Sequence, residues 1–222
     1  MHATRFVSSR AARVILAGLV LGCAAAAADA QTVRNNGTGT NNGFFYSLFT
    51  SSGSSTMTFP SPQFPGNYAL TWSGVGDVVG GKGWNPGSNR TVNYNVGAAQ
   101  GFNTISVYGW TTNPLVEYYI NEMGSLFTAN ATRKVTVNAD GHTYTTFIHQ
   151  QVNQPSIVGT ATFNQYLDAW GGASKGANHA VTTGTHFAHW QRLGMPMGQF
   201  NYMILATEAF NGASGSVNAT VW

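Results

Sequence analysis

The sequence predicts an all-β fold, a sandwich or barrel of sheets with a single short helix. From Gly43 onward, short runs rich in Val, Ile, Thr, Tyr and Phe alternate with clusters of Gly, Pro and Asn. This spacing is typical of strands joined by turns. Charge is sparse, since only 8% of the residues are Asp, Glu, Lys or Arg. Uncharged polar side chains must therefore cover much of the surface, as in many secreted β proteins.

Three segments follow one another along the chain. Residues 1–30 have the pattern of a secretory signal peptide: early arginines, an apolar Ala-rich run, and Ala28-Asp29-Ala30 at the predicted cleavage site. Residues 31–43 contain almost no apolar side chains and are predicted to form a flexible N-terminal arm. Residues 44–222 show neither a repeat nor a linker and are predicted to form one domain.

Charge and cysteine content exclude several classes of function. Without residues 1–30, the chain keeps seven basic and six acidic residues, which argues against nucleic-acid binding. The single cysteine, Cys23, lies in the predicted signal, so the rest has no disulfide, zinc ribbon or thiol nucleophile. No later apolar run reaches the ~20 residues that span a bilayer. We expect a secreted, extracellular protein, with lipid anchoring through Cys23 as the minor alternative.

Strands are predicted wherever β-branched and aromatic residues cluster between turn signals. The clearest runs are Thr91–Val96, Thr104–Trp110, Val116–Ile120, Lys134–Val137, His142–Val152, Gly159–Trp170, Asn201–Phe210 and Ser216–Trp222. Asp140-Gly141 lies between two of these runs and is a signal for a tight hairpin.

One stretch breaks the strand pattern. Residues Thr185–Leu193 place Phe187 and Trp190 three positions apart, which is a helical spacing. Thr183 is the predicted N-terminal cap, and Gly194 is the predicted stop. We expect a single short helix that packs on the back of a sheet.

Two of the six remaining acidic residues lie inside apolar strand runs, Glu117 and Glu208. Because side chains alternate along a strand, Glu117 shares a face with Tyr119, and Glu208 shares one with Tyr202. A carboxylate among aromatic rings is partly desolvated, so its pKa can shift. Paired carboxylates and aromatic rings in a groove are what sugar hydrolysis needs. The alternative is that each glutamate faces solvent at a sheet edge.

Metal and cofactor chemistry are not indicated. No pair of histidines shows ligand spacing with a carboxylate partner in the sequence. His186 and His189 are three positions apart in the predicted helix, and without an acid nearby they are expected to face solvent or pack. We therefore expect no metal and no organic cofactor.

Several motifs together resemble a known family. The motifs are GGKGWNPG at 80–87, YGWTTNPLVEYY at 108–119, VNQPSI at 152–157, GTATF at 159–163 and ATE at 206–208. In this order and spacing they closely resemble the xylanases of glycoside hydrolase family 11. The resemblance extends from Gly43 to Trp222, so residues 44–222 are expected to form the catalytic domain.

The resemblance implies a β-jelly roll sandwich of two curved antiparallel sheets with one short α-helix and a cleft for xylan. It places the nucleophile at Glu117 and the general acid/base at Glu208, in a retaining mechanism. The two carboxyl groups are then expected ~5–5.5 Å apart. The implied protein is an endo-1,4-β-xylanase. We expect it to be a monomer.

Further residues acquire expected roles from the resemblance. Tyr108 and Tyr119 match tyrosines that contact the sugar beside the scissile bond, and Gln165 matches an amide near the nucleophile. Pro155 and Ser156 match the tip of a thumb loop that closes over the substrate, where proline pre-sets the turn.

Asp77 aligns beside the general acid/base, at a position where Asp is associated with acid-active members. Two carboxyl groups in contact titrate as a pair, so we expect an acidic pH optimum. The competing interpretation is a turn residue in the Gly76-Asp77 loop. Tyr202, on the face of Glu208, completes the expected substrate-binding set together with the altered positions below.

Several positions depart from the family pattern. Gln151 stands where the thumb strand usually carries Arg, and Phe49 and Leu167 each stand for a Trp. Phe210 lacks a usual tyrosine hydroxyl, and Val158 replaces an acid. Each lost contact costs on the order of 1 kcal/mol, so we expect weaker xylan binding or a shifted preference among substituted xylans. The alternatives are a secreted xylan-binding protein with little turnover and a related β-1,4-glucanase.

Overall fold

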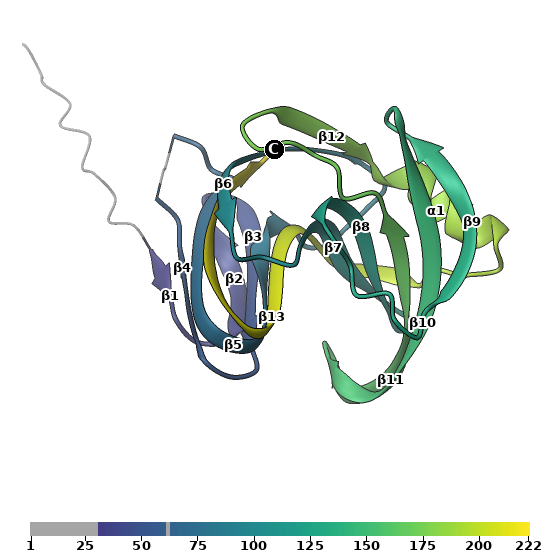
Figure 1. Ribbon diagram of the computed structural model, residues 1–222, viewed down its shortest axis with the longest axis horizontal. Helices are drawn as coiled ribbons and strands as arrows, with labels where there is room; N and C mark the ends of the chain where they lie inside the picture. Colours follow the sequence, from purple (N-terminus) through teal and green to yellow (C-terminus); the bar gives the residue numbers. More distant parts are fainter. Residues whose placement is uncertain (1–30, 61–62) are drawn as a thin grey trace, which may run out of the picture.

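The computed structural model describes residues 31–60 and 63–222. The predicted signal peptide, with Cys23, lies outside this range. The described elements are β1 (Thr32–Val33), β2 (Gly37–Asn41), β3 (Phe44–Thr50), β4 (Ser54–Thr58), β5 (Asn67–Trp84), β6 (Thr91–Gln100), β7 (Thr104–Thr112), β8 (Val116–Gly124), β9 (Thr132–Ala139), β10 (His142–Ser156), β11 (Gly159–Ala169), β12 (Asn178–Thr182), α1 (Thr183–Arg192) and β13 (Gln199–Val221). Figure 1 shows strongly curved strands, with α1 beside β9. The predicted all-β jelly roll with one short helix is confirmed.

The strands form one continuous sheet that folds into two layers, because the long strands β5 and β13 run through both layers. The main path of hydrogen-bonded strands is β1-β4-β5-β13-β7-β8-β11-β10-β9. The first part of β5 pairs with β4 and its last part with β3, while β13 pairs first with β7 and then with β6. β13 bends at register shifts between Phe210 and Gly215. The paired strands are antiparallel except β8 and β11, which are parallel.

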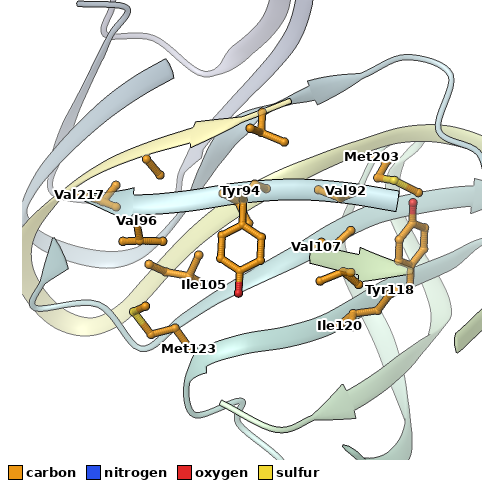
Figure 2. Close-up of a cluster of buried hydrophobic side chains, with 14 of the residues drawn as sticks. Val92, Tyr94, Val96, Ile105, Val107, Tyr118, Ile120, Met123, Met203 and Val217 are labelled. Carbon is orange, nitrogen blue, oxygen red and sulfur yellow. The ribbon is translucent and has the colours of Figure 1, made fainter. Parts of the chain in front are cut away.

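The main hydrophobic core lies between the two layers. Figure 2 shows Tyr94 of β6 directed toward side chains of β7 and β8, including Ile105 and Ile120. Tyr94, Ile105 and Ile120 are all fully buried. Aromatic and β-branched side chains of this size supply most of the apolar area that stabilises such a sandwich.

A second, smaller cluster of buried side chains lies on the opposite face of the inner layer, which is the layer that contains β7, β8 and the first part of β13. It contains Tyr108, Tyr119 and Tyr202, together with Val79 and Ile204. Strand alternation explains both clusters, since neighbours in sequence point to opposite faces. The second cluster forms the floor on which the candidate site is built.

The predicted helix is confirmed, and it begins earlier than expected. α1 covers Thr183–Arg192, and Phe187 and Trp190 pack against Tyr118 of β8 at ring-centroid distances of 5.3 and 6.2 Å. Thr183 is therefore not the cap, because its hydroxyl donates to the carbonyl of Arg90 instead. Gly194 follows the helix with a φ of 71°, as a stop residue does. In the described part of the chain, no helix is long and apolar enough to cross a membrane.

The segment 31–43 is not the flexible arm that its composition predicted. β1 pairs with β4, and β2 pairs with β3 in the antiparallel sense. The side-chain amide of Asn36 also exchanges two hydrogen bonds with the backbone of Thr50, at 2.9 and 2.7 Å. Backbone pairing at a sheet edge requires no apolar side chains, so a polar segment can complete the edge of β3.

The expectation that His186 has no acid nearby is also wrong. β11 places Asp168 under the helix, and Nδ1 of His186 lies 2.7 Å from Oδ2 of Asp168 with both side chains fully buried. The indole of Trp190 donates a hydrogen bond to Asp168 as well, at 3.0 Å. A buried carboxylate is stable only when it is partnered in this way.

Replacing His186 with leucine is expected to lower the free energy of unfolding by about 3 kcal/mol, because Asp168 stays buried without one of its partners. Urea unfolding followed by tryptophan fluorescence measures the change. The control is Gln191→Leu on the exposed face of the same helix, with an expected change within about 0.5 kcal/mol. A loss no larger than the control's would contradict a stabilising role for the pair.

Candidate active site

A cleft of about 350 Å³ opens over the second cluster, on the concave face of the inner layer. The residues that the sequence analysis selected for the site all line it: Phe49, Asp77, Tyr108, Glu117, Tyr119, Gln151, Pro155, Ser156, Gln165, Tyr202 and Glu208. They come from β3, β5, β7, β8, β10, β11 and β13. The structure thus brings the whole set together, and the role of each residue stays a prediction.

Glu117 is held by three hydrogen bonds. It lies on β8 and only 7% of the residue is exposed. Oε1 accepts from the hydroxyls of Tyr108 at 2.7 Å and Tyr119 at 3.2 Å, and Oε2 accepts from Nε2 of Gln165 at 2.7 Å. Burial raises the pKa of Glu117, and these three donors oppose the rise because they stabilise the charged form.

The amide of Gln165 is itself oriented by its neighbours. Its Oε1 accepts a hydrogen bond from Nε2 of Gln151 at 3.0 Å, and Nδ1 of His149 lies 3.3 Å from the same oxygen. With its oxygen engaged there, Gln165 presents its NH₂ group to Glu117. Gln151, expected only as a weaker substitute for an arginine, therefore contacts the residue that positions Glu117.

Glu208 and Asp77 lie on neighbouring strands. β13 pairs with β5 so that Glu208 is opposite Val79 and Phe210 is opposite Asp77, which makes the two acids diagonal neighbours. Burial raises the pKa of Glu208 well above its usual value, and the charges of Asp77 and Glu117 raise it further. Burial also raises the pKa of Asp77, to about 6. Two close carboxyl groups of this kind retain a proton more readily than either would alone.

Aromatic rings form the wall beside the carboxyl groups. Tyr108 lies between Tyr119 and Tyr202, with ring centroids 4.8 and 6.1 Å away. Phe49, which stands for a tryptophan of the family pattern, lines the same cleft and is half-buried. Ring faces of this type stack on the apolar faces of sugars, while tyrosine hydroxyls can bond to sugar hydroxyls.

The thumb is the hairpin between β10 and β11. Pro155 and Ser156 line the cleft from its tip. The hydroxyl of Ser156 donates to the carbonyl of Gly159 at 2.5 Å and accepts from the backbone N–H of Val158 at 3.1 Å. Ser156 therefore stabilises the turn, and Val158 projects into solvent with 63% of its surface exposed.

Sequence reasoning missed some of the lining residues. Asn36, Gly37 and Thr38 contribute to the cleft from the segment that was predicted to be flexible, and no sequence signal indicated them. Trp110 was detectable, because it alternates with Tyr108 along the same strand. Its indole donates to the hydroxyl of Tyr108 at 2.7 Å, which fixes the orientation of a group that contacts Glu117.

A second hollow adjoins the cleft on the side of the two acids. Beyond the residues that it shares with the cleft, it is lined by four apolar and two polar residues: Leu126, Phe127, Leu167, Phe210, Thr104 and Asn211. The family departures at Leu167 and Phe210 therefore lie here and add apolar surface to this hollow. In the described part of the chain, no group of three His, Cys, Asp or Glu side chains could hold a metal ion.

Comparison with known proteins places this arrangement in a family. The model of glycosyl hydrolases family 11 matches residues 41–220, which include every strand of the cleft from β3 to β13. The chain belongs to glycosyl hydrolases family 11. The sequence resemblance to this family is thereby confirmed.

Relatives of the family 11 chain carry xylanase names. It is 48% identical over 188 residues to endo-1,4-beta-xylanase B of Phanerodontia chrysosporium, covering 83% of this chain and 63% of the relative. It is 44% identical over 194 residues to endo-1,4-beta-xylanase 2 of Rhizopus oryzae, covering 86% and 88%. It thus spans less than two thirds of the first relative's length. One solved structure comes from a structural comparison of two major endo-1,4-beta-xylanases of Trichoderma reesei. It aligns with this chain with a TM-score of 0.69 at 37% identity, and the alignment covers 86% of this chain and 99% of that one.

Proposed function

We propose that this family 11 protein is a secreted, monomeric endo-1,4-β-xylanase that cleaves internal β-1,4 linkages of xylan and retains the anomeric configuration. The observation that carries the proposal is the unequal environment of two carboxyl groups in one cleft. Glu117 is fixed by three hydrogen-bond donors, whereas Glu208 has a pKa raised by burial and by neighbouring charges. Such a division matches one carboxylate nucleophile and one carboxylic acid.

In the first step, Glu208 donates its proton to the glycosidic oxygen as the bond to C1 breaks. The carboxylate of Glu117 attacks C1 from the other side and forms a covalent glycosyl-enzyme. The hydroxyls of Tyr108 and Tyr119 keep the attacking carboxylate in place, so little reorganisation is needed.

In the second step, water replaces the departed sugar. Once Glu117 is esterified its negative charge is gone, so one of the charges that raised the pKa of Glu208 is removed. Glu208 then accepts a proton from the water as it attacks C1, and Glu117 leaves as a carboxylate. Two inversions at the same carbon give net retention.

The decisive experiment follows xylan hydrolysis by the purified protein with ¹H NMR. The β-anomer of the new reducing end is expected to appear first and the α-anomer later, by mutarotation. Early appearance of the α-anomer would contradict the retaining mechanism. Binding to xylan without release would favour the xylan-binding alternative, and release from a β-1,4-glucan but not from xylan would favour a glucanase.

Secretion and the monomeric state are tested separately. The signal-like pattern of residues 1–30 supports export. N-terminal sequencing of protein from the culture medium is expected to begin at Gln31. Sedimentation velocity is expected to give the mass of one chain, and a dimer mass would overturn the monomer proposal.

A further inference from the structure

A separate hollow lies beyond the cleft, at the ends of β2, β3 and β5. It has a volume of about 580 Å³ and is lined by Thr40, Phe45, Trp84, Asn85, Ser88 and Arg90, with glycine and proline backbone between them. None of the predicted site residues lines it. Two aromatic rings, two hydroxyls, an amide and a guanidinium thus converge where the family 11 chemistry does not take place.

The guanidinium of Arg90 is held in this hollow and keeps donors free. Its Cζ lies 4.1 Å from the centroid of the Trp84 ring, and its Nε donates to the hydroxyl of Ser88 at 3.0 Å. The backbone N–H of Arg90 is anchored by the hydroxyl of Thr183, also at 3.0 Å. Within residues 31–60 and 63–222, neither terminal nitrogen of this guanidinium makes a hydrogen bond. A stacked and tethered guanidinium is a preorganised fork for a carboxylate.

No acid of the described chain neutralises this charge. The single salt bridge within residues 31–60 and 63–222 joins His186 to Asp168, and the hollow is lined by no Asp or Glu. Arg90 is half-buried, so the screening of its charge is weaker than at an open surface. An anionic group that enters the hollow can therefore bind to the guanidinium of Arg90 without competition from a carboxylate of the hollow.

The hollow lies next to the cleft along β2. Asn36, Gly37 and Thr38 line the cleft, and the next residues of β2, Gly39 and Thr40, line the hollow. The ring of Phe45, in the hollow, also stacks on Tyr202, in the cleft, with centroids 5.2 Å apart. A polysaccharide that occupied the cleft and extended along β2 would bring a neighbouring sugar or a side branch to the hollow of Arg90.

We propose that the hollow around Arg90 binds a uronic acid substituent of the polysaccharide that occupies the cleft. The proposal rests on the proposed function. The guanidinium binds the carboxylate through two parallel hydrogen bonds, the rings of Phe45 and Trp84 contact the sugar face, and Ser88 and Asn85 bond to its hydroxyls. A neutral sugar could make the contacts with the rings and with Ser88 and Asn85, but it would lack the two hydrogen bonds to the guanidinium. The hollow thus makes acidic xylans the preferred substrates of this chain.

Binding to the hollow is tested without turnover by NMR of the tryptophan indole N–H groups. The probes are methyl β-D-glucuronide and methyl β-D-glucoside, and a Trp84→Phe variant assigns the reporting signal. The glucuronide is expected to shift the Trp84 signal with at least about tenfold higher affinity than the glucoside. Arg90→Gln is expected to remove this difference, whereas Arg192→Gln, at the exposed end of α1, is expected to keep it. Equal responses to the two probes, a difference that survives in Arg90→Gln, or an equal response to sulfate would overturn the proposal.

Hydrolysis gives the second measurement. Glucuronoxylan and the same polymer with its carboxyl groups reduced to alcohols form a matched pair of substrates. The kcat/KM of the wild type is expected to be about tenfold higher on the acidic polymer, and Arg90→Gln is expected to equalise the two. A parallel loss on both polymers, with a lowered Tm, would show a merely structural role for Arg90. If neither polymer is cleaved, the proposed function is wrong. The indole titration still tests whether the hollow binds a uronic acid.

Discussion

Replacing Glu117 with glutamine is expected to lower kcat on xylan by on the order of 10⁴-fold or more, because an amide cannot form the glycosyl ester. The substitution keeps the size of the side chain and two positions for hydrogen bonds, so the fold is expected to persist. Reducing-sugar release measures the loss. A 2-fluoro xylobioside with a good leaving group is expected to label the wild type on the peptide that contains Glu117.

The chain provides a matched control in Glu122→Gln. Glu122 lies on the same strand and is also buried, but its carboxylate accepts hydrogen bonds from Tyr94 and Tyr144 in the main core, each at 2.8 Å. Its loss is expected to change stability and to leave kcat within about tenfold of the wild type. Activity that survives Glu117→Gln, or a label on another carboxylate, would contradict the nucleophile assignment.

Alternation along the strands explains how part of the candidate site could be predicted from the residues, whereas Asp77, Gln165, Gln151 and the thumb residues were placed by the family resemblance. A carboxylate inside an apolar run faces the core, a cleft or solvent at a sheet edge, and its neighbours two positions away face the same way. Tyr119 beside Glu117, and Tyr202 along the strand of Glu208, follow from this rule alone. In the same way, the three-residue spacing of Phe187 and Trp190 predicted the helix.

The features that were missed depend on the backbone or on distant pairing. β2 is polar and Gly-rich, and it exists because the edge of β3 offers unpaired backbone groups. β5 contains several glycines that local propensity disfavours. At Gly81, however, a Cβ would lie only 1.9 Å from the carbonyl oxygen of Leu205, so only glycine permits the close pairing with β13. The pairing of His186 with Asp168 joins residues 18 apart in sequence, which no local pattern predicts.

We expect Asp77 to set the pH dependence of the site. One of its carboxylate oxygens, Oδ1, is buried without a hydrogen-bond partner among the described residues. Its diagonal neighbour, Glu208, has a raised pKa to which the charge of Asp77 contributes. We therefore expect the two carboxyl groups to share a proton and to titrate as a pair.

The sign of the expected pH effect follows from this pair. If Asp77 were ionised, the release of a proton by Glu208 would leave two negatively charged carboxylates side by side. Glu208 is therefore expected to act as an acid only in the form in which both Glu208 and Asp77 are protonated. The pair begins to lose its protons near the pKa of Asp77, about 6, and activity is expected to fall as pH rises through that value. The optimum of the wild type is therefore expected on the acid side.

Asp77→Asn is expected to move the optimum upward by about one pH unit. Asparagine carries no charge and no titratable proton. In the variant, the fall of activity at high pH therefore follows the titration of Glu208 alone. Removing the charge of Asp77 lowers the pKa of Glu208 somewhat, but burial is the larger cause of its rise and is unchanged by the substitution. The profile of kcat/KM from pH 3 to 9 on one soluble xylan measures the shift.

The direction of the shift separates two physical roles for Asp77. If Asp77 acts only as a nearby charge that raises the pKa of Glu208, its removal moves the basic limb downward. An upward shift requires that the wild-type limb belongs to the shared pair, and an unchanged limb excludes coupling of either kind. Asp140→Asn, in an exposed turn, is the matched control and is expected to leave the profile in place. The same substitution chemistry at two sites thus distinguishes a proton shared with Glu208 from a general change in charge.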